Sequence, residues 1–406
     1  MARDIITVRW VAGLFSPGGW LLLAVWMFLQ VEEVRVAAGP YARFFCFGAL
    51  AAAALLSWYY NRGRVLLVAV AAGLLVWGLG SLEVAGSLPR LAAVFLLPLN
   101  FALFAWLEES GVVSPGGILK MGLIPAQVLG VVVLGSRESR LLEGFLRWGE
   151  PAGGWTWMPL IELLAFAAAA LFLLALVFHR RTKVEVGLLW ALGAVFVGLN
   201  QTGKPEALLF YAGTAGLILL FAVLEHGYEV AYRDELTGLP GRRSLNERLP
   251  ELGGRYAIAM CDVDHFKNFN DTHGHEAGDQ VLRMVAAKLS RVPGGGRAFR
   301  YGGEEFTLVF ADRSAKEALP FAESLREAIA GSGFVLRGPD RPPEKPEQKP
   351  EPRSTTAVTI SISIGLAERS KSHSTPELVL EAADHALYRA KEAGRNCVKL
   401  AEGTPA

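Results

Sequence analysis

The chain has 406 residues, which is enough for two domains of ordinary size, and 52% of its residues are hydrophobic. Its formal net charge of +1 excludes the strong basic excess of a general nucleic-acid-binding protein, so we expect no nucleic acid among its partners. The three cysteines, Cys46, Cys261 and Cys397, have neither metal-ligand spacing nor an evident pairing, which argues against a disulfide framework.

The first half of the chain has the composition of a membrane protein. Residues 1 to about 225 are dominated by Leu, Val, Ala, Phe and Trp, whereas the chain from Arg233 onward resembles an ordinary soluble domain. A membrane-spanning helix needs about 20 apolar residues. Candidate spans lie at about 10–30, 41–60, 65–82, 91–108, 123–136, 160–179, 185–201 and 206–224. We therefore expect residues 1–224 to form an all-α membrane helix bundle of about eight transmembrane helices in a lipid bilayer.

Positive charges in the short loops predict the orientation of this bundle. Asn61–Arg64 and Arg180–Lys183 are compact basic turns, which are typical of the cytoplasmic side. Arg137, Arg140 and Arg147 then fall on the opposite side and count against this scheme, unless they belong to an interfacial amphipathic helix. We expect a multi-pass protein of the inner (cytoplasmic) membrane with its C-terminal domain in the cytoplasm.

A short connector links the two halves. Residues 225–233 provide about two helical turns between the last span and the turn-rich segment 234–241, whose Gly and Pro residues break the helix. So short a connector either transmits a displacement of the last span directly or is a passive linker.

Two pairs of acidic residues follow predicted strands in the second half. The apolar run 256–261 predicts a strand buried on both faces, and Asp262 and Asp264 emerge where it ends. A predicted hairpin around 300–306 places Glu304 and Glu305 at its tip, after two glycines. Mg²⁺ binds few protein carboxylates and completes its shell with substrate phosphates, so Asp262 and Glu304 are candidate ligands.

Three cations are candidates for binding phosphates: Lys267, Lys391 and Arg395. Lys391 and Arg395 are four residues apart at the end of a helix that starts near Leu378. They would share one helix face if the helix continues through Gly394. Phosphoryl transfer uses such cations to neutralise developing charge.

Five sequence blocks follow one another in the second half. They are Asp234-x-Leu-Thr-Gly-Leu, Asp262-x-Asp-x-Phe-Lys-x-x-Asn-Asp-x-x-Gly-His-x-x-Gly-Asp279, Gly302-Gly303-Glu304-Glu305-Phe306, Ser361-Ile-Ser-Ile-Gly365 and Ala383-Asp384-x-Ala-Leu-Tyr388-x-Ala-Lys391-x-x-Gly-Arg395-Asn396. In this order and at this spacing, the segment of about residues 233–400 resembles the GGDEF-domain family of diguanylate cyclases.

The resemblance implies an α/β palm-like nucleotidyl cyclase (GGDEF) domain at 234–402, which condenses two GTP into cyclic di-GMP plus pyrophosphate. It implies Mg²⁺ (or Mn²⁺) as the cofactor and a homodimer with one GTP in each half. Residues 1–224 would then be a sensor domain for an unknown ligand. The segment 338–356, rich in Pro and charge, is expected to be a disordered insertion, either a tolerated surface loop or a docking segment.

The resemblance also implies roles for individual residues. Asp262, the backbone carbonyl of Val263 and Glu304 would hold the metals, and Glu305 would be a further acidic participant. Asn270 and Asp279 would bind guanine, whose N1–H and N2–H₂ donors suit a carboxylate. The triphosphate would be held by backbone amides near His265 and Phe266 together with Lys267, Lys391 and Arg395. Asp234 would pair with Arg300.

Two other functions remain as alternatives. The chain could be a catalytically silent receptor for GTP or cyclic di-GMP, although such domains usually lose the acids that this chain retains at Asp262, Glu304 and Glu305. It could also be a transporter with a regulatory soluble domain, but internal repeats are not evident. The family's inhibitory Arg-x-x-Asp element is replaced here by Pro293–Gly296, so we expect no high-affinity product feedback site.

Overall fold

The computed structural model describes residues 17–81, 88–135, 144, 148, 158–201, 204–335 and 357–402. The chain divides into two compact units, Met1–Tyr228 and Glu229–Ala406. The domain bounds expected from the sequence are finer than this division and stay a prediction.

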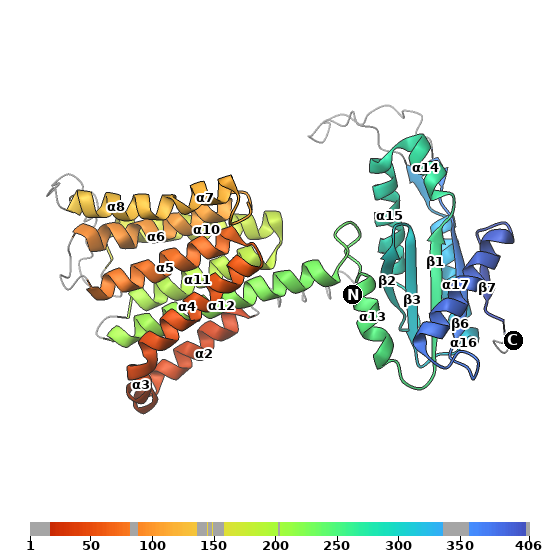
Figure 1. The fold of residues 1–406 in the computed structure, drawn as a ribbon, viewed down its shortest axis with the longest axis horizontal. Coiled ribbons are helices and arrows are strands. Elements are labelled where there is room, and N and C mark those ends of the chain that lie inside the picture. The colour runs from red at the N-terminus through yellow and green to blue at the C-terminus, as the bar shows by residue number, and fades with distance from the viewer. Residues whose placement is uncertain are drawn as a thin grey trace. The chain divides into compact units, whose positions relative to one another are not determined.

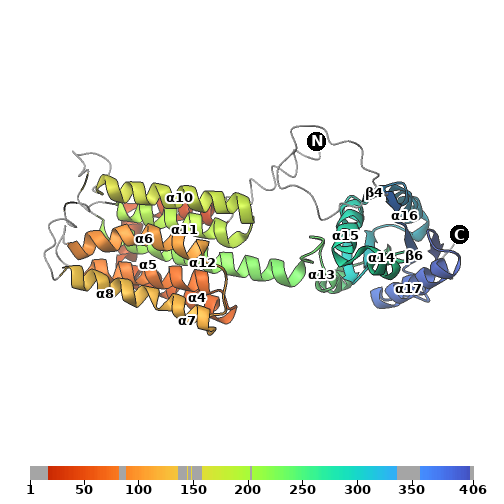
Figure 2. The same cartoon turned by 90° about the horizontal axis from the view of Figure 1, so that it is seen from above.

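The N-terminal unit is a bundle of helices built from runs of Leu, Val and Ala (Figures 1 and 2). Its described elements are α2 (Gly18–Gln30), α3 (Glu32–Ala38), η1 (Gly39–Tyr41), α4 (Ala42–Tyr59), α5 (Gly63–Ser81), α6 (Leu88–Trp106), α7 (Pro115–Met121), α8 (Leu123–Gly135), α10 (Leu160–Arg180), α11 (Lys183–Leu199) and α12 (Pro205–Tyr232). Each of the apolar stretches expected to span a membrane overlaps with one of these helices.

The expected number of about eight membrane spans is not supported. Three described helices are long and apolar enough to cross a membrane: Glu32–Tyr59, Leu160–Arg180 and Glu206–Tyr232. Others are apolar but short, as in Gly18–Gln30, which has 13 residues. At 1.5 Å per residue such a helix reaches only about 20 Å, whereas the hydrocarbon core is about 30 Å thick. Within the described residues, three helices are therefore long enough to cross the membrane.

Several predicted features lie outside the described residues. They are the start of the first expected span, most of the arginine-bearing loop at 137–159, and the insertion at 338–356. The predicted connector at 225–233 is described, and α12 continues through it as one helix to Tyr232.

The C-terminal unit is built on a five-stranded sheet of order β2-β3-β1-β6-β7. The strands are β1 (Tyr256–Val263), β2 (Arg297–Gly302), β3 (Glu305–Ala311), β6 (Ile362–Glu368) and β7 (Val398–Leu400). β1 is buried along its whole length and pairs antiparallel with both β3 and β6, which confirms the strand predicted at 256–261. β2 and β3 form the predicted hairpin, and β4 (Gly333–Val335) pairs with β5 (Ala357–Thr359) apart from the main sheet.

Helices cover both faces of this sheet, and the alternation of side chains along β1 assigns each residue to a face. Ala257, Ala259 and Cys261 pack in one core with α15 (His275–Leu289) and α16 (Ala315–Ala330). Ile258 and Met260 pack in the other core with α13 (Arg242–Arg248) and α17 (Pro376–Glu392). The remaining helix, α14 (Phe266–His273), follows β1 directly and leads into α15. Asp262 continues the even-numbered series and therefore faces α17.

The approach of α17 to β6 is so close that it requires glycine at position 365. A Cβ on Gly365 would lie 2.0 Å from the backbone nitrogen of Leu387 and 2.1 Å from the backbone oxygen of Ala383. Backbone atoms of a packed helix cannot move aside as a side chain can, so a methyl group here would push α17 off the sheet.

We expect Gly365→Ala to destabilise the C-terminal unit by about 2–3 kcal/mol or more. Gly253→Ala is the matched control, because a Cβ there meets nothing within 4 Å. Pulse proteolysis of the full-length protein across a series of denaturant concentrations would measure the difference in the free energy of unfolding. Equal stability of the two variants would contradict this packing.

Candidate active site

Asp262 lies at the centre of a group of charged side chains where β1 ends. Its Cα is in register with Glu305 on β3 and with Ser363 on β6, so both neighbouring strands flank it. The side chain is buried. Burial raises the pKa of Asp262, and this effect is opposed by the hydrogen bond and charge of Lys391.

Lys391 reaches this carboxylate from the last turn of α17, with 2.9 Å between its Nζ and Oδ2 of Asp262. The condition for Lys391 and Arg395 to share a helix face is not met, because α17 ends at Glu392 and Gly394 has φ 102°. Arg395 follows with φ 66°, so it lies on a left-handed turn rather than on the helix face of Lys391. Its charge still acts on Asp262 and lowers the pKa of that carboxyl.

Glu304 lies at the tip of the β2–β3 hairpin, as the two preceding glycines predict. Its backbone oxygen accepts a hydrogen bond from the amide of Val263 at 3.3 Å, which ties the hairpin tip to the end of β1. Burial raises the pKa of Glu304, and the nearby charge of Asp262 raises it further. Two carboxylates that repel each other in a partly buried place form a site for a cation.

Asn270 and Asp279 come from the two helices after β1. Asn270 is on α14 and Asp279 on α15, and Gly278 beside it is buried against Asn270. A Cβ on Gly278 would lie 1.9 Å from Oδ1 of Asn270, and that oxygen is buried without a hydrogen-bond partner. The polar group of Asn270 is therefore held in place by packing while its oxygen stays unused by the protein.

The start of α14 presents backbone amides and the exposed side chain of Lys267. His265 precedes the helix in a left-handed conformation with φ 57°, Phe266 is buried beneath it, and Lys267 is exposed. These three residues lie immediately beyond Asp264, so the chain turns sharply at the end of β1. The turn leaves the first amides of α14 without partners inside the helix.

Asp234 and Arg300 form the expected pair. The Arg300 guanidinium donates to Oδ1 of Asp234 at 2.7 Å and to the backbone oxygen of Gly303 at 2.7 Å. Hydrogen bonds from Thr237 and Arg300 hold the pKa of Asp234 below its usual value despite burial. The turn after α12 is thus joined to the hairpin that carries Glu304.

Asp264 was not predicted as a site residue, yet it makes more hydrogen bonds than Asp262. Its carboxylate accepts from the hydroxyls of Ser361 at 2.7 Å and Ser363 at 2.6 Å, and from the backbone amide of Asn396 at 3.0 Å. The sequence signal was the repeated serine in Ser361-Ile-Ser363, which places two hydroxyls on one side of the chain beside the end of β1.

The residues around Asp262 fit a magnesium ion as an oxygen-only donor set. Among the residues that the structure describes, no three His, Cys, Asp or Glu side chains are grouped to hold a metal by themselves. Mg²⁺ commonly binds one or two carboxylates plus substrate phosphates, so two carboxylates suffice. The ammonium of Lys391 on Asp262 shows that the pocket accepts positive charge.

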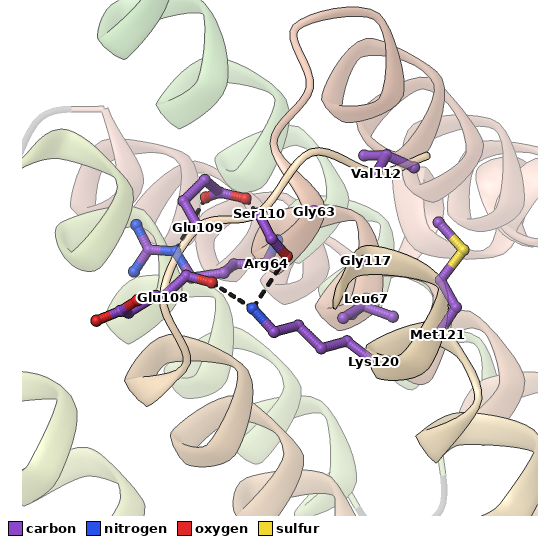
Figure 3. Close-up of a pocket in the computed structure, with 10 residues that line it drawn as sticks. All are labelled: Gly63, Arg64, Leu67, Glu108, Glu109, Ser110, Val112, Gly117, Lys120 and Met121. Carbon is purple, nitrogen blue, oxygen red and sulfur yellow. Dashed lines mark hydrogen bonds and ion pairs between the residues drawn. The ribbon is translucent and has the colours of Figure 1, made fainter. Parts of the chain in front are cut away.

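The N-terminal unit has a small separate pocket with a cavity volume of about 10 Å³, shown in Figure 3. Nε of Arg64 lies 3.0 Å from Glu109, and Lys120 donates to Ser110 at 3.0 Å. Arg64 also reaches the fully buried Glu185 at 3.0 Å. The ion pairs of Arg64 with Glu109 and Glu185 are structural contacts between α5, α11 and the loop after α6.

The loop at Pro293–Gly296 contains two glycines in the left-handed region. Gly294 has φ 72° and Gly295 has φ 80°, and the backbone oxygen of Gly294 accepts from Nε of Arg313 at 2.6 Å. Phe321 packs against Gly294 on the same loop. The segment is thus a tight glycine turn.

Comparison with known proteins places this geometry in a family. Residues 231–339 and 344–397 match the family model described as "Diguanylate cyclase, GGDEF domain". The C-terminal unit therefore carries a GGDEF domain with the expected α/β palm-like fold.

Curated relatives agree with this match over the same share of the chain. Response regulator PleD of Caulobacter vibrioides is 36% identical over 184 residues, which are 43% of this chain and 37% of that protein. Diguanylate cyclase DgcP of Pseudomonas aeruginosa is 38% identical over 186 residues, which are 44% of this chain and 25% of that protein. The chain thus spans well under half the length of these two relatives.

A solved structure is also similar. The crystal structure of the coiled coil and GGDEF domain of DgcB from Caulobacter crescentus in complex with c-di-GMP is 32% identical. The match covers 44% of this chain and 90% of that one, with a TM-score of 0.38.

The raised pKa of Glu304 predicts that this residue costs stability at neutral pH. A carboxyl whose pKa is raised by folding stabilises the fold below its ordinary pKa, and this contribution is lost as pH rises through the raised value. We expect Glu304→Gln to raise the melting temperature of the metal-free full-length protein at about pH 7.5, with the gain vanishing near about pH 4.

Glu381→Gln is the control for this measurement, because Glu381 is an exposed residue on α17. Differential scanning fluorimetry across the pH range compares the two variants. A melting temperature that falls in Glu304→Gln at neutral pH would show that the carboxylate is stabilising and that its environment is not the one described.

Proposed function

We propose that the protein is a membrane-anchored diguanylate cyclase that condenses two GTP molecules into cyclic di-GMP and releases pyrophosphate. The observation that carries the proposal is the group of Asp262, Glu304 and Lys391, which meet at the end of the central strand of a GGDEF domain. This group combines cation-binding carboxylates with a phosphate-binding ammonium.

In this proposal Asp262, Glu304 and the backbone carbonyl of Val263 hold Mg²⁺ (or Mn²⁺). The bound metal would lower the pKa of the attacking 3′-hydroxyl and neutralise charge on the α-phosphate. The protein's own part is to keep both carboxylates ionised and near each other at a cost in stability. Glu305, in register with Asp262, is the further acidic group of the site.

The cations would hold the triphosphate. Lys391 and Arg395 lie on the side of the sheet that Asp262 faces, and both lower the pKa of Asp262 through their charge. Lys267 is exposed at the start of α14, beside the backbone amides near His265 and Phe266. Helix N-termini and cations together favour the negative charge of phosphates.

Asn270 and Asp279 would bind the guanine base. The buried Asn270 oxygen has no protein partner and would rotate toward a base N–H, and Asp279 is a half-buried carboxylate next to Gly278. Guanine offers N1–H and N2–H₂ donors, whereas adenine offers a different pattern, so this pair would favour GTP over ATP.

Formation of a cyclic dinucleotide needs two substrates facing each other. Each site as described has one guanine-binding pair and one pair of metal-binding carboxylates, so one domain would hold one GTP. We therefore propose a homodimer in which each GTP attacks the α-phosphate of the other, with a proton leaving the 3′-hydroxyl and pyrophosphate leaving the phosphorus.

The N-terminal unit would anchor the enzyme in the inner membrane and sense a ligand that is unknown. Three apolar helices of sufficient length support the membrane location, and α12 is one of them. The turn after α12 is joined to the hairpin of Glu304 through the Asp234–Arg300 pair, so a displacement of α12 can reach the site. The catalytic domain would lie in the cytoplasm, where GTP is available.

A receptor without catalytic activity is the second candidate function. It would bind GTP or cyclic di-GMP in the same site, but it has no need of two carboxylates whose pKa values are both raised. The retention of these two costly charges favours the enzyme.

Detergent-purified full-length protein with GTP and Mg²⁺ should produce cyclic di-GMP, detected by chromatography of the nucleotides. Glu304→Ala should lower the rate by about a hundredfold or more, because it removes a metal-binding carboxylate. Glu381→Ala on the exposed face of α17 is the control and should retain the wild-type rate. Product should continue to accumulate as its concentration rises, since the Pro293–Gly296 turn has no arginine–aspartate pair.

The enzyme proposal would be overturned if the wild-type protein bound GTP but made no product in any of the reconstituted lipids tested. That result would favour the receptor function. Product from Glu304→Ala at the wild-type rate would remove this carboxylate from the reaction. Binding is measured separately with a fluorescent GTP analogue, so that the two candidate functions give different results.

Gly278→Ala should raise KM for GTP by about tenfold or more with little loss of stability. The added methyl meets the end of a flexible side chain, so Asn270 can rotate away, but its amide then leaves the guanine-binding position. Gly253→Ala, where a Cβ meets nothing within 4 Å, is the matched control. An unchanged KM would show that Asn270 does not bind the base.

A further inference from the structure

Asp264 is separated from Asp262 by a single residue but serves a different part of the molecule. β1 ends at Val263, so Asp264 leaves the strand, and its backbone amide donates to the backbone oxygen of Ser361 at 3.0 Å. Its buried carboxylate then turns toward the chain before β6 and toward the loop after α17. Among the described residues, the two acids of this motif share no hydrogen-bond or ion-pair partner.

The three donors to Asp264 occupy both oxygens of the carboxylate. Oδ1 accepts the hydroxyl of Ser363, and Oδ2 accepts both the hydroxyl of Ser361 and the amide of Asn396. A carboxylate satisfied in this way has little capacity left for a metal ion. It is, however, well suited to fix the position of each group that donates to it, because charge-assisted hydrogen bonds are short and strong.

The loop after α17, which Asp264 holds, has an unfavourable backbone conformation. Gly394, Arg395 and Asn396 have φ of 102°, 66° and 44°, three successive residues in the left-handed region. Glycine adopts this region readily and asparagine more often than most residues, but arginine does so only when the surroundings hold it there. The amide of Arg395 donates back to Ala390 at 3.1 Å, and the amide of Asn396 donates to Asp264.

The position of Arg395 depends on this loop. Its side chain is exposed, so no packing around it determines where it points. The loop is instead anchored by its backbone: Asn396 on Asp264 at 3.0 Å, and the oxygen of Cys397 on the amide of Ile364 at 3.0 Å. One anchor lies just beyond the end of β1 and the other on β6, the strand that pairs with β1 at Asp262.

We propose that Asp264 is a positioning residue, whose carboxylate holds the Arg395–Asn396 turn against the end of β1 so that Arg395 can bind the substrate's phosphates. The role rests on the proposed cyclase activity, which supplies the triphosphate. It acts through substrate binding rather than through the reacting atoms, because the Asp264 carboxylate is occupied by its hydrogen bonds to Ser361, Ser363 and Asn396. Asp262 and Glu304 remain the metal-binding acids.

Two variants of the full-length protein separate this role from metal binding. Asp264→Ala removes all three hydrogen bonds, and KM for GTP should rise by about tenfold while kcat changes by less than about threefold. Asp264→Asn keeps an oxygen for the Asn396 amide and an NH₂ group for Ser363, whose hydroxyl can rotate to accept. It should therefore rescue KM to within about threefold of wild type.

Amide hydrogen exchange of the segment 391–397, without nucleotide, tests the same role independently of catalysis. Exchange should be faster in Asp264→Ala and close to wild type in Asp264→Asn. Unchanged exchange in Asp264→Ala would overturn the proposal even in an active enzyme. Should Asp264→Ala fail to fold, Ser363→Ala, which removes one donor from the carboxylate, should show a smaller increase in the same segment, and no increase would overturn the proposal.

A metal-binding role would give a different pattern. Asp264→Asn would then lose activity as severely as Asp264→Ala and would need far more Mg²⁺, which would overturn the positioning role. If the wild-type protein makes no cyclic di-GMP at all, the proposed function fails, but the exchange measurement still decides whether Asp264 holds the turn.

Discussion

The ion pair between Lys391 and Asp262 is the contact on which the charged site of the C-terminal unit depends. It joins the last turn of α17 to the end of the central strand, with 2.9 Å between the two charged atoms. A buried carboxylate without a partner is costly, and removing one member of such a pair leaves the other uncompensated. The pair therefore fixes which face of the sheet becomes charged, and Glu304 and Arg395 are arranged around it.

The charged site around Asp262 and Glu304 lowers the stability of the fold. Burial raises the pKa of both Asp262 and Glu304, so the fold keeps two ionised acids where neutral side chains would be more stable. Elsewhere the same sheet is apolar and tightly packed, as the close approach of α17 to Gly365 shows. The well-packed centre of the sheet supports the unfavourable charges at its end.

Polar contacts in the N-terminal unit have a different character. Glu185 is completely buried but is joined to Arg64 at 3.0 Å and to Arg180 at 3.3 Å, so its charge is compensated within the bundle. Lys183 pairs with Glu225 on α12 at 3.5 Å and links the helix that leaves this unit to its neighbour. These pairs hold helices together at one end of the bundle, whereas the acids of the catalytic unit leave room for further cations.

Local patterns were sufficient for much of this protein. The apolar run at 256–261, the glycines before Glu304 and the five sequence blocks each depend on residues close together in the chain, and they predicted the buried strand, the hairpin and the GGDEF domain. The Asp234–Arg300 pair also followed from the family resemblance. The helical nature of the apolar first half was predicted equally well, because hydrophobic stretches of this length form helices.

Only the tertiary structure decided how these pieces are used. Three helices among the described residues are long and apolar enough to cross a membrane, where about eight spans were expected. The left-handed turn after α17 took Arg395 off the helix face of Lys391. Asp264, which looks in the sequence like a second copy of Asp262, binds Ser361, Ser363 and Asn396 instead. Its partners lie about a hundred residues or more away, so the fold alone brings them together.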